Sequence, residues 1–200
     1  MITIKKNIFQ SELSIQEMVE LIISEGIRRE VNLLCTSKEP TLTLSATQVK
    51  WIENFINPDC KIVHLLGDRQ TGRTSIGTGM VLTTALFQDN STSMIISSRE
   101  DVIRYLHKKT LDYLRTFCEV FNLPELVIMM NRDVIELSNG SKIFFRRNTE
   151  NALRGMSLDN IFLDLNEPVR TVERISEELM ANMICATSMK MGKIIVTMGA

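Results

Sequence analysis

The sequence predicts an α/β protein: a mostly parallel β-sheet with helices on both faces and one inserted β-hairpin. Three observations predict this fold class. Apolar runs of strand length alternate with longer segments whose apolar residues recur at helical spacing. A glycine-rich turn links one such run to a helix. The pair Asn139-Gly140 stands between two β-rich runs and favours a tight antiparallel turn.

The expected elements follow one another from residue 44 onward. Strands are expected at 62–66, 93–97, 134–138, 141–145, 159–164 and 193–197. Helices are expected at 44–57, 74–87, 98–122 and 172–187. Ser97 with Glu100, or Ser98 with Asp101, can cap the third of these helices. Residues 126–130 are apolar, and their pattern leaves helix and strand open.

Residues 1–43 are expected to form a helical appendage and a linker ahead of a core at 44–200. Ser14 and Glu17 make a capping-box pattern, and apolar residues recur at helical spacing up to Leu34. This helix either packs on the core or binds a partner. Pro40 marks the linker.

Composition excludes several classes of protein. The chain has 200 residues and a formal net charge of −1, so it lacks the overall basic character of many nucleic-acid binders. No apolar run approaches the roughly 18 residues of a membrane span, and no signal peptide is expected. The four cysteines are not spaced as a zinc site, which favours free thiols.

Residues 67–75, here called the phosphate loop, are the most informative stretch. They read Gly-Asp-Arg-Gln-Thr-Gly-Arg-Thr-Ser and match Gly-x4-Gly-Lys-Thr except that Arg73 replaces the lysine. Glycines let backbone N–H groups point inward, and the following helix adds positive charge from its N-terminus. The pattern predicts a phosphate-binding loop; a chance glycine turn is the alternative.

Hydrolysis of ATP in such a fold requires few additional parts. Mg²⁺ needs a hydroxyl from the loop and a carboxylate from a strand end. Thr74 is the candidate hydroxyl, and Asp164, at the end of an apolar strand, is the candidate carboxylate. The expected cofactors are therefore ATP and Mg²⁺.

Gln48 precedes the phosphate loop at a distance where some ATP motors place a glutamine. Its amide offers a donor and an acceptor together, which suits the edge of adenine. The alternative is that Gln48 completes a capping box with Ser45 at the start of a helix.

These motifs together resemble the ATPase domain of the large terminase subunit, the DNA-packaging motor of tailed phages and herpesviruses. The loop resembles the family's Ser-Arg-Gln-x-Gly-Lys-Thr form, and Gln48 matches its adenine-binding glutamine. The hairpin, the segment 152–155 and the strand ending on Asp164 follow in the family's order. The resemblance implies a P-loop NTPase of the ASCE/RecA-like class.

The resemblance also implies roles for individual residues. Nucleotide binding would use Gln48, Gly67, Arg69, Gln70, Thr71, Gly72, Arg73, Thr74 and Ser75. Thr74 and Asp164 would bind the metal. Arg69, Arg154 and Glu167 would take part in catalysis, with Arg154 near the γ-phosphate or across a subunit boundary. Glu167, three residues after Asp164, is the candidate base; the alternative is that it only starts the next helix. For Arg154, a plain surface arginine is an equal alternative.

The implied function is an ATP-hydrolysing motor that drives double-stranded viral DNA into a procapsid in the host cytoplasm. Its implied partners are that DNA, the portal protein, the small terminase subunit and other copies in a ring. No membrane is expected. The family continues into an RNase H-like nuclease, which this chain is not expected to contain.

Two departures from the family pattern favour an alternative. Arg73 keeps the positive charge of the loop lysine but not its shape. Leu165 follows Asp164 where the family has glutamate. Both departures suit a terminase-derived component that binds nucleotide or assembles without hydrolysis. A helicase-like ATPase is a third reading, disfavoured by the Arg-Gln pair of the loop.

Overall fold

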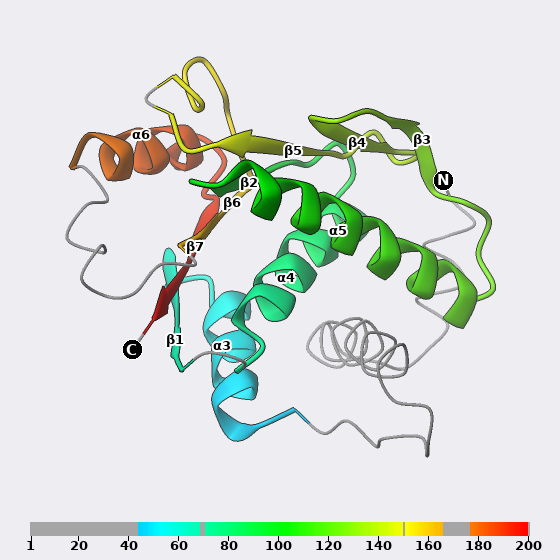
Figure 1. Cartoon of the computed structure of the whole chain (residues 1–200), viewed down its shortest axis with the longest axis horizontal. Helices are drawn as coiled ribbons and strands as arrows, with labels where there is room; N and C mark the ends of the chain where they lie inside the picture. The colour runs from blue at the N-terminus through cyan, green and yellow to red at the C-terminus, as the bar shows by residue number, and fades with distance from the viewer. Residues whose placement is uncertain (1–43, 69–70, 150, 166–176, 200) are drawn as a thin grey trace.

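The structure, a computed structural model, describes residues 44–68, 71–149, 151–165 and 177–199. Within them a seven-stranded sheet, in the order β1-β7-β6-β2-β5-β4-β3, is flanked by helices (Figure 1). The elements are α3 (Ala46–Ile56), β1 (Ile62–Gly67), α4 (Arg73–Phe87), β2 (Thr92–Ser97), α5 (Glu100–Val120), β3 (Val127–Met130), β4 (Val134–Leu137), β5 (Lys142–Arg147), β6 (Asn160–Asp164), α6 (Glu177–Ser188) and β7 (Lys193–Gly199). The predicted appendage at 1–43 lies outside the described residues.

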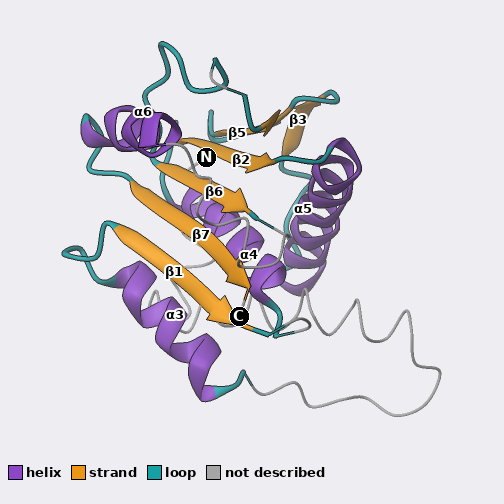
Figure 2. Cartoon of the chain, turned by 60° about the vertical axis from the view of Figure 1, so that its left-hand side comes forward, coloured by secondary structure: helices purple, strands orange, loops and turns teal. Residues whose placement is uncertain are grey.

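Five strands of the sheet are parallel. β1 pairs with β7, β7 with β6, β6 with β2 and β2 with β5 in parallel register. Their carboxyl ends therefore lie at one edge, as the arrows in Figure 2 show. One strand, β7, separates the strand that leads into the phosphate loop from the strand that ends on Asp164. The predicted sheet type is confirmed.

The predicted hairpin is confirmed at the far side of the sheet. β4 and β5 are antiparallel and joined through Asn139 and Gly140, whose φ of +81° suits glycine. The open segment 126–130 proves to be the antiparallel edge strand β3. Because β5 pairs with β2, the hairpin extends the parallel sheet.

Two apolar clusters fill the two faces of the sheet. Val63, Ile95 and Phe162 point to the face covered by α3, α4 and α5. Met94, Ile161 and Leu163, their strand neighbours, point to the face covered by α6. Successive side chains of each strand therefore point alternately into the two clusters. Helices cover both faces of the sheet, as predicted. None of the described helices has the length and apolar character needed to cross a membrane.

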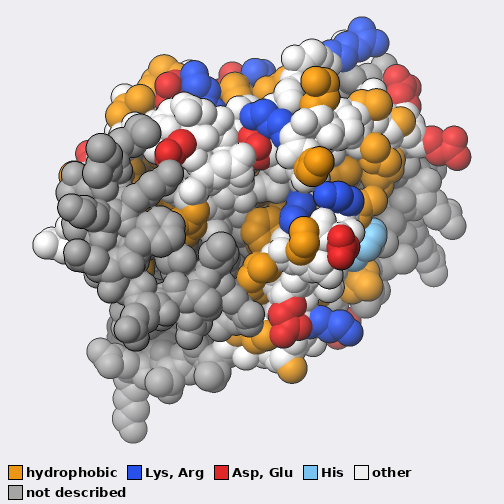
Figure 3. Space-filling model, turned by 180° about the vertical axis from the view of Figure 1, so that it is seen from behind, with side chains coloured by type: hydrophobic (Ala, Val, Ile, Leu, Met, Phe, Trp, Pro, Cys, Tyr) orange, Lys and Arg blue, Asp and Glu red, His pale blue; other side chains and the backbone are white. Residues whose placement is uncertain are grey.

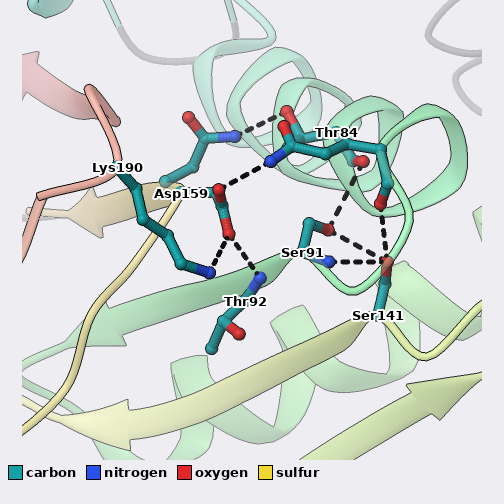
Figure 4. A network of polar contacts seen from close by, with 8 residues as sticks. Thr84, Ser91, Thr92, Ser141, Asp159 and Lys190 are labelled. Atoms are coloured by element: carbon teal, nitrogen blue, oxygen red, sulfur yellow. Dashed lines mark hydrogen bonds and ion pairs between the residues drawn. The ribbon is translucent and has the colours of Figure 1, made fainter.

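A polar network closes the amino edge of the sheet, opposite the phosphate loop (Figure 4). The buried carboxylate of Asp159, just before β6, accepts hydrogen bonds from Gln88 Nε2 and the Thr92 backbone N–H, both at 2.7 Å. Lys190 Nζ lies 2.8 Å from the same carboxylate. The end of α4, the start of β2 and the turn before β7 are therefore tied to one side chain.

The start of α5 differs from the expectation. Its N-cap is Arg99, with no side-chain capping bond, so neither predicted capping box forms there. Ser97 Oγ instead donates to the backbone carbonyl oxygen of Asp164 at 3.1 Å, across two neighbouring strands. The Ser97 hydroxyl therefore bonds to the end of β6 and does not cap α5. The predicted start of the last helix, before Glu177, lies outside the described residues.

Candidate functional site

The phosphate loop runs from the end of β1 into α4 at the carboxyl edge of the sheet. Gly72 adopts the left-handed conformation, with φ of +80°. This conformation favours glycine, and a Cβ atom at this position would also lie 2.8 Å from Nε2, at the flexible end of the Gln48 side chain. Thr71 Oγ1 donates to the Asp68 carbonyl at 2.9 Å and tightens the turn. Arg69 and Gln70 lie outside the described residues.

The N-terminus of α4 is open to an anion. Gly72 is its N-cap and offers no side-chain capping bond, and no acidic residue stands in the first turn. The first N–H groups of a helix have no partner within the helix, and the helix dipole adds positive charge there. Gly67, at the end of β1, and Ser75, buried in the first turn, frame this end of the helix.

Three side chains from three elements meet beside the loop. Thr74 Oγ1 donates to Asp164 Oδ2 at 3.2 Å, and Thr197 Oγ1 donates to Asp164 Oδ1 at 2.9 Å. The Leu165 N–H donates to Thr197 Oγ1 at 2.9 Å. The sequence-predicted pair Thr74 and Asp164 is thus brought together by the order β1-β7-β6, with β7 supplying Thr197 between them.

Burial sets the charge properties of Asp164, whose exposure is 1%. Loss of water raises the pKa of this carboxyl above its ordinary value. Hydrogen bonds from Thr197 and Thr74, followed by the positive charges of Arg73 and Lys109, lower it in part. A buried carboxylate that is only partly compensated gains from a cation placed against it.

Asp164→Asn should therefore raise the melting temperature of the ligand-free chain at neutral pH. A raised pKa in the folded state means that this group favours folding at pH below its unfolded pKa, and that this contribution is lost as pH rises through the folded pKa. The gap in melting temperature between variant and wild type should be widest at neutral pH and close in acid. Thermal unfolding across pH tests this, with exposed Asp59→Asn as the control. A difference in melting temperature that stays constant with pH, or that reverses its sign, would contradict a raised pKa for Asp164.

Arg73 begins α4 and points into the protein. Its Nη1 atom is buried and has no hydrogen-bond partner among the described residues. A buried guanidinium nitrogen without an acceptor is costly, and phosphate oxygens are acceptors that suit its planar fork. The open helix end, this nitrogen and the hydroxyl–carboxylate pair of Thr74 and Asp164 together fit a magnesium-bound nucleotide.

Gln48 has both ends of its amide engaged. Oε1 accepts from the Ser45 N–H at 2.8 Å, completing the capping box at the start of α3. Nε2 donates to the Thr71 carbonyl at 2.9 Å. Gln48 therefore joins α3 to the phosphate loop. Contact with adenine stays a prediction, and it requires the amide to release one of these partners.

The remaining predicted residues are placed elsewhere or lie outside the described part. Arg154 is exposed and lines a separate cleft of about 510 Å³ at the end of β5, together with Arg146 and Arg147. The residues that line this cleft include neither Thr74 nor Asp164. Glu167 lies outside the described residues, so its role as a base stays a prediction.

Sequence reasoning missed three residues near Asp164: Thr197, Ser97 and Lys109. Ser97 ends β2, and Thr197 directly follows the apolar residues 194–196 of β7; a hydroxyl residue directly after an apolar run was the available signal. The adjacent charges of Lys108 and Lys109 predict that both lie on the solvated face of their helix, yet Lys109 is 3% exposed. Its neighbour Lys108 takes the exposed position instead.

Comparison with solved structures identifies the fold. The bacteriophage HK97 large terminase matches with a TM-score of 0.62 and 12% identity, over 88% of this chain and 36% of that one. The large terminase of a thermophilic bacteriophage, solved in complex with ADP, matches with a TM-score of 0.54 and 14% identity, over 78% and 39%. The fold is that of a phage large terminase ATPase domain.

The terminase likeness rests on structure, since no family model and no curated protein matches the sequence. The chain spans somewhat more than a third of the length of these two large terminases. The predicted resemblance and fold class are confirmed.

Proposed function

We propose that this chain is the ATP-binding motor domain of a large terminase, which hydrolyses ATP to move viral DNA into a procapsid. One observation carries the proposal: Thr74 and Asp164 lie 3.2 Å apart beside the open N-terminus of α4. This is where a terminase fold with a phosphate loop needs a magnesium-binding hydroxyl and carboxylate. A large terminase of similar fold was solved in complex with ADP, which supports nucleotide binding.

Each residue then has a physical role. The N–H groups of the loop and of the first turn of α4 hold the phosphates, and Arg73 Nη1 finds the acceptor that it lacks. Thr74 and Asp164 would hold Mg²⁺, which when bound supplies positive charge against the phosphate oxygens. Thr197 fixes the orientation of the Asp164 carboxylate, and Ser97 fixes its backbone.

Nucleotide binding gives the direct test. Arg73→Ala and Thr74→Ala should each weaken the affinity for ATP with Mg²⁺ by roughly 10- to 100-fold, because each removes a contact to a charged group. Isothermal titration measures the affinity. Arg115→Ala, which removes a side chain that is 63% exposed on α5, is the matched control and should bind as the wild type does. Unchanged affinity in both loop variants would refute the proposal.

A second candidate function has an observation in its favour. Leu165, not a carboxylate, follows Asp164 at the end of β6. A domain with this arrangement would bind nucleotide and assemble with partners without efficient hydrolysis. Single-turnover hydrolysis on the sample used for titration separates the two. Turnover favours the motor, whereas binding without turnover favours the assembly component.

The proposed partners are double-stranded viral DNA, the portal protein, the small terminase subunit and further copies in a ring, in the host cytoplasm. Lys and Arg side chains lie among Asp and Glu side chains on the face shown in Figure 3. DNA contact would therefore use a local group of cations. Arg146 and Arg147, exposed at the end of β5, are the proposed phosphate contacts.

A further inference from the structure

Lys109 is a buried lysine on α5, with 3% of its surface exposed. Its Nζ donates a hydrogen bond to Tyr105 Oη at 3.1 Å. The same atom lies 5.3 Å from the centre of the Tyr105 ring and 5.5 Å from that of Tyr113. Lysine is seldom buried, since removing an ammonium from water is costly. The fold offsets part of this cost with two aromatic faces.

The direction of the side chain brings the ammonium toward the nucleotide edge. Side chains of a helix tilt toward its N-terminus, and Lys109 reaches Tyr105, one turn earlier. The N-terminus of α5 follows the carboxyl end of β2. That strand end is where Ser97 contacts the backbone of Asp164. Lys109 therefore points along α5 toward the edge that carries Asp164.

The positive charge of Lys109 acts on the proposed nucleotide site. It interacts with the charge of the Asp164 carboxylate, as the charge of Arg73 does. Two cations from two helices, α4 and α5, thus act on one carboxylate. A ligand with several negative charges placed beside Asp164 would therefore be attracted by both charges.

We propose that Lys109 faces the terminal phosphate of a bound nucleoside triphosphate and supplies, from α5, the point charge that the phosphate loop lacks. The inference rests on the proposed nucleotide site. Arg73 carries a broad planar group, whereas an ammonium is compact and concentrates its charge. The two cations then have different roles. Arg73 binds phosphate at the loop, and Lys109 distinguishes a triphosphate from a diphosphate.

The test is the ratio of the affinities for ATP and ADP, both measured with Mg²⁺ by titration calorimetry. In Lys109→Met, affinity for ATP should fall roughly tenfold or more, while affinity for ADP should change less than about twofold, because only ATP carries the terminal phosphate. Lys108→Met, next along the same helix but exposed, removes the same charge from the surface and should leave both affinities unchanged. Thermal unfolding confirms that each variant is folded.

Lys109→Gln provides a second variant that keeps a hydrogen-bond donor for Tyr105, and it should show the same selective loss. An unchanged ratio in folded Lys109→Met or Lys109→Gln, with ATP still bound, overturns this inference and leaves the proposed function intact. Equal losses for ATP and ADP overturn it as well, because they mark a structural role. Failure of the wild-type chain to bind either nucleotide overturns the proposed function, and the inference with it.

Discussion

Leu165→Glu should raise the rate of ATP hydrolysis by roughly 10²- to 10⁴-fold, the range that a positioned general base contributes. The backbone at this position is already fixed, since the Leu165 N–H donates to Thr197 Oγ1 at 2.9 Å. The new carboxylate would stand directly after Asp164, at the strand end beside Thr74. The Leu165 side chain is half-buried and packs against the cluster beneath α6.

Leu165→Gln is the matched control, because it has the size of glutamate and cannot accept a proton at neutral pH. Single-turnover measurements at saturating ATP compare the two variants with the wild type. Equal rates in Leu165→Glu and Leu165→Gln would show that the absent carboxylate is not what limits turnover. If the wild type hydrolyses ATP slowly and only Leu165→Glu raises the rate, the chain has a motor fold that lacks its general base.

Asp159→Ala should lower the free energy of unfolding by about 3–5 kcal/mol, the cost of removing one partner from a buried ion pair. The change leaves the Thr92 N–H and Gln88 Nε2 without their 2.7 Å acceptors. Part of the effect is screened, because the Lys190 side chain is 32% exposed. Urea denaturation measures the loss.

Two further variants calibrate that result. Asp159→Asn keeps one carbonyl acceptor and should lose less stability than Asp159→Ala. Asp59→Ala removes an exposed carboxylate and should stay within about 0.5 kcal/mol of the wild type. A loss below about 1 kcal/mol in Asp159→Ala would mean that the network at the amino edge contributes little to the fold.

Local patterns account for the part of the fold and site that the sequence predicted. The strand, glycine turn and helix around Gly72 are contiguous, and so is the hairpin at Asn139 and Gly140. Each of these local structures is determined by residues that are neighbours in the sequence. Asp164 was found because an aspartate that ends an apolar strand is unusual enough to notice. Ser45 and Gln48 form the predicted capping box for the same local reason.

Residues that depend on strand order were missed. Thr197 meets Asp164 only because β7 inserts between β1 and β6, and no local pattern specifies that order. Lys109 was misplaced because its helix carries charged residues at adjacent positions, and spacing alone did not decide which of Lys108 and Lys109 faces inward. Two tyrosines one turn away on either side, Tyr105 and Tyr113, were the overlooked indication.

The position of β7 has a consequence for the order in which the chain folds. Among the described residues, β1 pairs in the sheet only with β7, in a register that joins Ile62 to Ile194. Pairing between segments so distant in sequence is slow, because a long loop must close first. During synthesis, β2, β4 and β5 can pair before β7 has left the ribosome, whereas β1 must wait. Competence to bind nucleotide should therefore appear late and in one step, when β7 enters the sheet and brings Thr197 to Asp164.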